Sequence, residues 1–148
     1  MHPDLPLSTT HEVRDRCLCL HLQRAARHVG RRFDEALRPF QLTNGQFSLL
    51  MALNRPDAPK LGEVATLLVM DRTTLTANLK PLVRRDLLTI EPDPADRRSR
   101  RLLLGDAGRM LLIDALPVWR TVHEAIDAEL AQVESAPILK QLLALSFD

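Results

Sequence analysis

The sequence predicts a mainly α-helical fold that contains one small β-hairpin. Apolar residues recur at helical spacing along most of the 148 residues, which indicates several amphipathic helices. Between residues 61 and 104 the pattern becomes a short helix, a tight turn, a second helix, and two apolar runs around a loop rich in Pro, Asp and Arg. Two apolar runs joined by such a loop are typical of a hairpin. The expected architecture is a winged helix-turn-helix lobe with further helices at both chain ends.

The N-terminal third predicts a tail followed by two helices. Residues 1–10 carry two prolines and no apolar periodicity, so we expect a mobile tail. Thr10 is a suitable cap for a long helix that ends near Leu37, before Pro39. A second helix is expected over residues 43–54, with Thr43 as its cap. One face of the long helix is apolar and carries Cys19, Leu22, Ala26, Val29, Phe33 and Leu37.

The helix pair at residues 61–84 has the periodicity of two packed helices. Apolar residues of the first helix are Leu61, Val64, Ala65 and Leu68. Asp71 is a good N-cap for the second helix, whose buried stripe is Leu75, Leu79, Leu82 and Val83. The opposite face lacks carboxylates and carries Thr73, Thr74, Ala77, Lys80, Pro81 and Arg84. A solvated face normally mixes both signs of charge, whereas a helix in a DNA groove excludes acids.

The hairpin loop is strongly basic, with arginine at positions 97, 98, 100 and 101. Solvated arginines are the commoner case, but four at one hairpin tip favour contact with the negative potential of a narrow minor groove. Residues 71–101 hold eight Lys/Arg and five Asp/Glu, a net charge of +3, while the remaining twelve and fourteen give −2. The positive charge of the chain therefore belongs to the segment that would meet DNA.

The C-terminal third predicts two apolar helices. A long helix is expected over residues 106–134, bent by Pro117. Ser135 is a suitable cap for a last helix with Ile138, Leu139, Leu142, Leu143 and Leu145. A short helix this apolar requires a partner, which is either its own domain or a second subunit.

Several motifs in this order resemble the MarR family of bacterial transcription regulators. They are D-R-T-T-L-T from Asp71, N-L-K-P-L from Asn78, D-x-R at Asp96 and Arg98, and a helix start with Gly105 and Gly108. The resemblance covers roughly residues 12–146. Val69 and Asp86 stand where the family usually has glycine, and Ala77 stands where many members carry an arginine that reaches DNA. Base preference therefore does not transfer from relatives to this chain.

The resemblance implies one domain over residues 11–148. Its winged helix-turn-helix would span about 43–104, and its dimerisation helices about 11–38 and 106–146. It also implies that Asp96 holds the Arg98 side chain extended toward DNA; the alternative is a local surface ion pair of little energetic weight. The expected DNA-binding residues are Arg72, Thr73, Thr74, Lys80, Arg84, Asp96, Arg98 and Arg100.

The implied function is sequence-specific regulation of transcription, as a repressor. A homodimer would bind a pseudo-palindrome in double-stranded DNA and be released by a small aromatic effector. Two alternatives stay open: a thiol-based oxidant sensor and a winged-helix adaptor that binds protein. Cys19 falls where the family's organic-peroxide sensors place their reactive cysteine, and it lies on the apolar helix face. Oxidation there would disturb packing between the lobes.

Other functions find no support in the sequence. It has no nucleophile elbow, phosphate-binding glycine loop or paired carboxylates, so we expect no enzyme and no catalytic residue. Metal motifs such as Cys-x-x-Cys are absent, and we expect neither metal nor cofactor. The N-terminus shows no basic start followed by an apolar run, and no stretch reaches about 18 apolar residues, so we expect neither a signal peptide nor membrane association. The spacing of Cys17 and Cys19 disfavours a disulfide, which indicates the cytoplasm.

Overall fold

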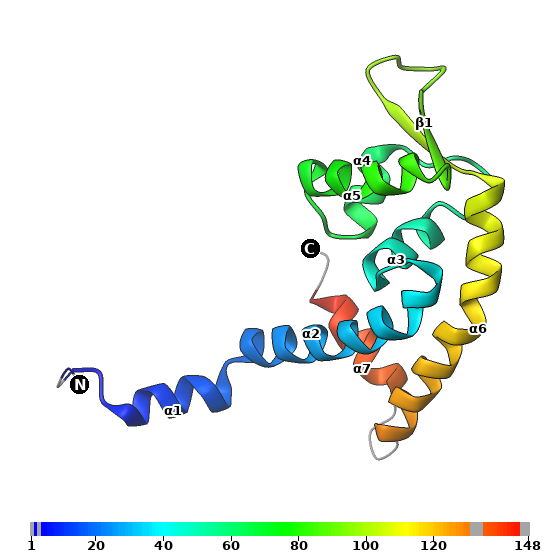
Figure 1. Cartoon of the computed structure of the whole chain (residues 1–148). Helices are drawn as coiled ribbons and strands as arrows, with labels where there is room; N and C mark the ends of the chain where they lie inside the picture. Colours follow the sequence, from blue (N-terminus) through cyan, green and yellow to red (C-terminus); the bar gives the residue numbers. More distant parts are fainter. Residues whose placement is uncertain (1, 3, 131–134, 146–148) are drawn as a thin grey trace.

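A computed structural model describes residues 2, 4–130 and 135–145 and confirms the predicted fold class (Figure 1). Within these residues the sheet is a single antiparallel hairpin of two strands, and the other elements are helical. The elements in chain order are α1 (Leu7–Arg16), α2 (Leu18–Leu37), the 3-10 turn η1 (Arg38–Phe40), α3 (Asn44–Ala52), α4 (Leu61–Leu67), α5 (Arg72–Arg84), β1 (Leu88–Pro92), β2 (Arg100–Leu104), α6 (Asp106–Glu129) and α7 (Ser135–Ala144).

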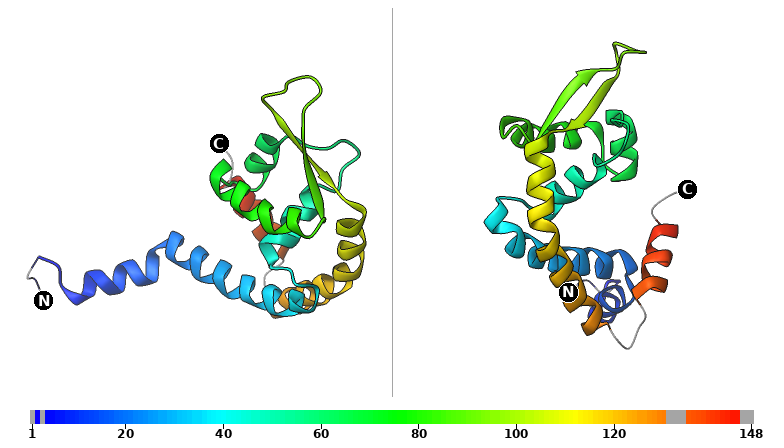
Figure 2. Two further views of the ribbon diagram at one scale, coloured as in Figure 1. Left: turned by 45° about the horizontal axis from the view of Figure 1, so that its top comes forward. Right: turned by 90° about the vertical axis from the view of Figure 1, so that its right-hand side faces the viewer.

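The N-terminal region differs from the single helix predicted from Thr10. Helix α1 begins at Leu7, inside the segment expected as a tail, and the chain is extended at Cys17 (φ −72°, ψ 100°) before α2 begins. The Cys17 sulfur accepts a hydrogen bond from the Leu20 N–H at 3.4 Å and so caps α2. No Pro or Gly marks this break, which is why periodicity missed it. The left view in Figure 2 shows α1 and the start of α2 extending away from the rest of the chain.

Cys19 does not lie in buried packing, contrary to our prediction. Its side chain is exposed, and its sulfur accepts a hydrogen bond from the Gln23 amide at 3.3 Å. Only the C-terminal half of α2 reaches the core, where Phe33 and Leu37 are buried. The apolar face of α2 therefore extends beyond the part of the helix that the rest of the chain covers.

The core joins α2, α3 and α6 to the helix-turn-helix pair. Trp119 of α6 lies between Phe33 and Phe47, with both ring centroids 6.1 Å from its own. The predicted capping of α3 is confirmed, since the Thr43 hydroxyl accepts from the Gln46 N–H at 3.2 Å. The most deeply buried side chains include Leu37, Leu49, Leu50, Val64, Leu75, Leu79, Leu82, Leu88 and Leu102.

The helix-turn-helix ends in tight turns at the positions where glycine is usual. Val69 and Asp86 have φ of 49° and 55°, in the left-handed region. After α4, the Met70 N–H donates to the Ala65 carbonyl at 2.8 Å, and the Val69 N–H donates to Thr66 at 3.1 Å. These bonds satisfy the last carbonyls of the helix. The geometry is thus what a glycine would adopt, and a β-branched residue is strained in it.

We expect Val69→Gly to stabilise the fold by about 1 kcal/mol. The left-handed conformation costs a side chain ~1–2 kcal/mol, and part of this gain is offset by the greater chain entropy of glycine when unfolded. Little packing is lost, because Val69 is 66% exposed. Urea unfolding measures the change. The control is Thr66→Gly within α4, which should destabilise the fold by roughly a few tenths of a kcal/mol. Equal effects of the two changes on stability would show that the Val69 backbone is not strained.

The wing and α6 are fixed against each other at the base of the hairpin. The strands pair Leu88 with Leu104 and Pro92 with Arg100. A Cβ on Gly108 would lie 2.2 Å from the Leu87 carbonyl oxygen, so only glycine allows α6 to start this close. Helix α6 contains Pro117 and changes direction along its length in Figure 1, as predicted.

The end of the chain is described in part. Residues 131–134, including Val133, lie outside the described residues, as do the side chains of Ser135 and Leu143. Of the described helices, none has both the length and the apolarity that crossing a membrane requires.

Candidate DNA-binding surface

The start of α5 is held by Asp71, as predicted. One carboxylate oxygen accepts from the Thr74 N–H at 2.8 Å, and the other accepts from the Thr74 hydroxyl at 2.6 Å. These hydrogen bonds lower the pKa of Asp71 below its usual range. The Thr74 hydroxyl therefore offers DNA only its lone pairs. Thr73 is exposed beside it, and its hydroxyl has no partner in the part of the chain that the structure describes.

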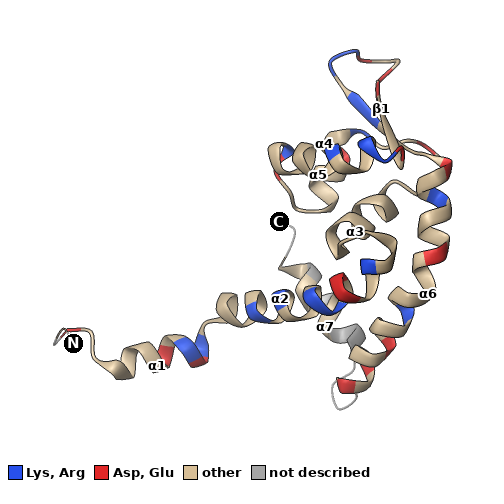
Figure 3. Cartoon of the chain, viewed as in Figure 1, with Lys and Arg blue, Asp and Glu red and all other residues tan. Residues whose placement is uncertain are grey.

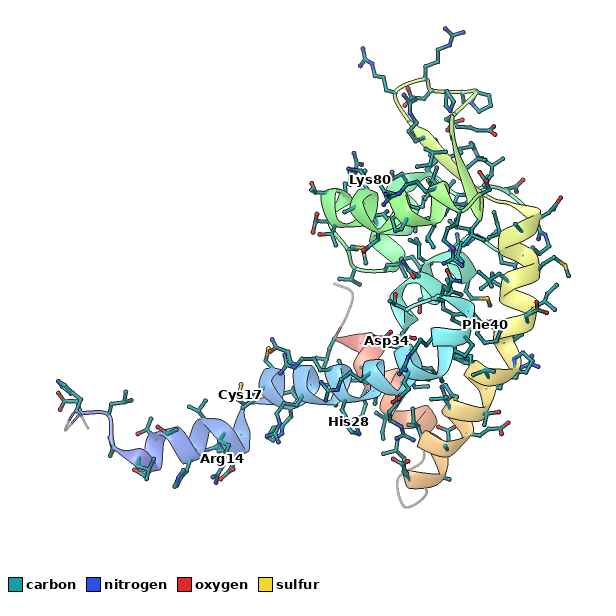
Figure 4. The ribbon with its side chains drawn as sticks, in the orientation of Figure 1. Arg14, Cys17, His28, Asp34, Phe40 and Lys80 are labelled. Atoms are coloured by element: carbon teal, nitrogen blue, oxygen red, sulfur yellow. The ribbon has the colours of Figure 1, made fainter. Side chains whose placement is uncertain are left out.

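All five residues predicted on α5 face away from the core. Arg72, Thr73, Thr74, Lys80 and Arg84 are exposed, whereas Leu75, Leu79 and Leu82 are fully buried behind them. We call the five exposed residues the recognition face. Its three cations have no ion-pair or hydrogen-bond partner among the described residues. Figure 4 labels Lys80 on α5, on the side of the molecule that carries the wing.

Arg85 has a structural role that sequence reasoning missed. Its guanidinium donates to the Gln41 carbonyl at 2.6 Å and to the Phe40 carbonyl at 3.1 Å. It therefore joins the end of α5 to the turn after α2. The two contacts span more than forty positions of sequence, so no local pattern could have indicated them.

The wing loop (residues 93–99) presents arginines, but its acid acts differently from our expectation. Asp96 accepts a hydrogen bond from the backbone N–H of Arg98 at 3.0 Å. It orders the main chain and forms no pair with the Arg98 guanidinium, which is exposed. Arg100 donates back to the Arg97 carbonyl at 2.9 Å. Figure 3 shows this basic tip projecting beyond α4 and α5.

The base of the wing contains a buried acid whose role was not predicted from the sequence. Asp93 is 1% exposed and lies between Lys60 Nζ at 3.0 Å and Arg101 Nε at 3.1 Å. A hydrogen bond from the Ala95 N–H, then the Lys60 cation, then Arg101 lower its pKa from 3.8 to about 2. The Arg101 guanidinium also donates to the Ala58 carbonyl at 2.8 Å. Arg101 thus faces inward while the other wing arginines face out.

We expect Asp93 to make the fold sensitive to acid. Because its pKa is lower in the folded chain, ionised Asp93 stabilises the fold above about pH 4, and this contribution is lost as the pH falls toward 2. Urea unfolding between pH 5 and 2.5 should show a steeper loss in the wild type than in Asp93→Asn. The exposed Glu91→Gln should keep the wild-type slope. Parallel curves for wild type and Asp93→Asn would contradict this role.

Two apolar hollows lie away from the recognition face. A cavity of about 370 Å³ between α3, α4 and α6 is lined by Phe47, Met51, Leu68, Leu116 and Trp119, among others. Phe47 and Trp119 thus contribute both to the core and to a cleft. A larger groove of about 660 Å³ lies between α2, α6 and α7 and is lined by apolar side chains including Leu22, Val29, Ile126, Leu130 and Leu139. Within the described residues, no cluster of His, Cys, Asp or Glu is arranged to hold a metal ion.

A winged helix-turn-helix with an acid-free recognition face and a basic wing defines a DNA-binding protein. Its helix-turn-helix and wing match a family model described as the MarR family, over residues 40–99. The transcriptional repressor NicR of Pseudomonas putida is 32% identical over 121 residues, which cover 80% of this chain and 76% of NicR. The chain belongs to the MarR family and is a DNA-binding transcription regulator, not an enzyme.

Solved structures of relatives superpose on nearly the whole chain. The M. tuberculosis transcriptional regulator MosR, in complex with DNA, is 34% identical with a TM-score of 0.80 and covers 88% of this chain and 94% of its own. The transcriptional repressor CouR, bound to a 23-mer DNA duplex, is 32% identical with a TM-score of 0.81 and covers 92% and 96%. CouR is also known bound to p-coumaroyl-CoA, in a chain 28% identical to this one with a TM-score of 0.81 that covers 93% and 96%.

Proposed function

We propose that the protein is a cytoplasmic repressor that binds a pseudo-palindromic operator as a homodimer and is released by a small aromatic effector. The observation that carries the proposal is the recognition face, whose cations lack partners among the residues that the structure describes, although both signs of charge occur elsewhere on the surface. Cations with no internal partner are available to phosphates. The wing adds further cations on the same side (Figure 3).

Each subunit would place the recognition face in a major groove and its wing in the adjoining minor groove. Lys80 and Arg84 would hold phosphates, while Arg72 and Thr73 approach base edges near the helix start. Arg98 at the wing tip would enter the minor groove. Arg100, held along the wing loop, would contact the backbone, and Asp96 would order the loop through its hydrogen bond with the Arg98 backbone N–H.

A second copy of the chain would cover the apolar surface left open at its two ends. Leu7, Val13 and Leu18 are each at least half exposed on the extending arm of α1 and α2. Leu139 is 57% exposed at the 660 Å³ groove between α2, α6 and α7. Exposed patches of this kind are typical of protein interfaces. A two-fold axis through this region would set two recognition faces against one duplex.

The effector would enter the cavity between α3, α4 and α6. Its lining includes two aromatic rings and the sulfur of Met51, which suits a flat apolar group. Because α4 belongs to the DNA-binding lobe and α6 leads to the dimer region, a ligand between them would change the spacing of the two recognition faces. The p-coumaroyl group that CouR binds is aromatic and supports an effector of this class.

Oxidant sensing through Cys19 is an alternative, and in the single chain this thiol is exposed rather than packed between the lobes. The exposed thiol could still react, and its proposed role is tested by DNA release with an organic hydroperoxide. We expect wild type, Cys17→Ser and Cys19→Ser to remain bound equally. Release that occurs in the wild type and is lost only in Cys19→Ser would instead make this thiol the sensor.

The proposed function is tested by selecting bound duplexes from a random pool. We expect an inverted repeat whose half-site centres are about one helical turn, ~10 bp, apart. A subsequent screen for aromatic compounds that release the selected duplex identifies the effector. Recovery of unrelated sequences, or of a single half-site, would contradict the dimeric regulator.

A further inference from the structure

The wing contacts the helix-turn-helix through backbone hydrogen bonds as well as through its covalent link to α5. Residues 58–60, just before α4, run beside β2: the Leu102 N–H donates to the Pro59 carbonyl at 3.0 Å, and Lys60 forms an antiparallel bridge with Arg101. This short pairing sets where the hairpin leaves the lobe. The α4 end of the connection is itself fixed, since the Lys60 N–H donates to the Glu63 carboxylate at 3.0 Å.

Asp93 links this connection to the wing loop. Its carboxylate lies between Lys60 and Arg101, one from the segment before α4 and the other from β2. Its backbone N–H donates to the Ser99 carbonyl at 3.1 Å, and its own carbonyl accepts from Asp96 at 3.2 Å, so the loop closes on the same residue. A fully buried carboxylate held by two cations has little freedom to move. The arginines of the wing loop therefore extend from a rigidly held base of the hairpin.

We propose that Asp93 is a positioning residue for DNA binding: held between Lys60 and Arg101, it fixes the wing relative to α5 so that Arg98 reaches the DNA. The proposal rests on the wing contact of the proposed function. Asp93 itself lies too deep to touch DNA, and it carries the same sign of charge as the phosphates. Its effect on affinity must therefore come through geometry.

The sign of the effect separates geometry from simple electrostatics. Removing a carboxylate near DNA should strengthen binding if charge alone matters. Removing a residue that positions the wing should weaken it. We expect Asp93→Asn, which keeps the shape of the side chain, to weaken binding to the selected operator at least tenfold. The control is Glu91→Gln on β1, where the same charge is lost from an exposed side chain, and it should bind as tightly as wild type or tighter.

A double-mutant cycle with Arg98→Ala tests whether Asp93 acts through the wing tip. Full-length wild type, Asp93→Asn, Arg98→Ala and the double variant are titrated against the operator by fluorescence anisotropy, with folding checked by circular dichroism. We expect Asp93→Asn to cost several-fold less once Arg98 is absent, because the tip contact that a misplaced wing would lose is then already gone and only the backbone contact of Arg100 remains. If Asp93→Asn does not fold, Lys60→Gln breaks one side of the same contact and takes its place in the cycle.

The outcomes distinguish this proposal from the proposed function. If Arg98→Ala weakens binding but folded Asp93→Asn binds like wild type or tighter, the positioning role alone is overturned. Equal losses from the Asp93 or Lys60 change with and without Arg98 overturn it as well, since Asp93 would then act independently of the wing tip. If Arg98→Ala changes nothing while the operator is still bound, the wing contact is wrong and the positioning role falls with it. No binding of the operator by wild type would instead overturn the proposed function.

Discussion

Lys80→Ala is expected to weaken binding to every DNA sequence by a similar factor, about 100-fold or more. A hydrogen bond between charged groups contributes ~1.5–3 kcal/mol, and the homodimer loses one such contact in each subunit. The slope of log affinity against log salt should fall by about 1.8, or ~0.9 for each lost phosphate contact. Anisotropy titrations across a salt series measure both quantities.

A matched cation away from the recognition face provides the control. Arg24 is exposed on α2, so Arg24→Ala removes the same charge and should leave the slope unchanged. Thr73→Ala should differ from both, because loss of a base contact relaxes sequence preference without changing the salt slope. An unchanged slope for Lys80→Ala would remove this residue from the DNA interface.

Leu139→Glu is expected to convert the dimer into monomers of 16.7 kDa. Leu139 lines the groove between α2, α6 and α7 and is 57% exposed in the single chain, so the change should leave the subunit folded. At a two-fold interface one glutamate from each subunit would be buried, and the dissociation constant should rise more than 100-fold. Sedimentation velocity at micromolar concentration measures the assembly.

Gln141→Glu is the control for this change, because it adds the same charge to an exposed position of α7 that does not line the groove. It should remain dimeric. A wild-type protein that sediments as a monomer, or a Leu139→Glu protein that stays dimeric, would show that the groove is not the interface.

The helix-turn-helix was predictable because its information is local. The apolar spacing of residues 75, 79 and 82, the cap at Asp71 and the turn residues all act within one or two helical turns. The usual glycine positions were also informative: Val69 and Asp86 stand there and adopt the left-handed backbone that glycine would. The exposed positions of the recognition face followed from helical geometry alone.

The contacts that sequence reasoning missed join distant segments. Asp93 meets Lys60 from 33 positions earlier, and Arg85 meets backbone carbonyls rather than side chains. Neither contact is reflected in the periodicity of the sequence. The break at Cys17 and the exposure of Cys19 were missed for another reason. Helical spacing in the first half of α2 predicts an apolar face, and burial requires a neighbouring element that this chain alone does not provide.

Sequence-specific binding by a symmetric dimer is tested by comparing the selected operator with a shuffled duplex of the same length and composition. Both are titrated by fluorescence anisotropy at the same physiological salt concentration. We predict that the operator binds at least about 1,000-fold more tightly, with one dimer per duplex, because specific sites exceed non-specific ones by ~10³ or more. Equal affinity for the two duplexes would rule out sequence-specific binding.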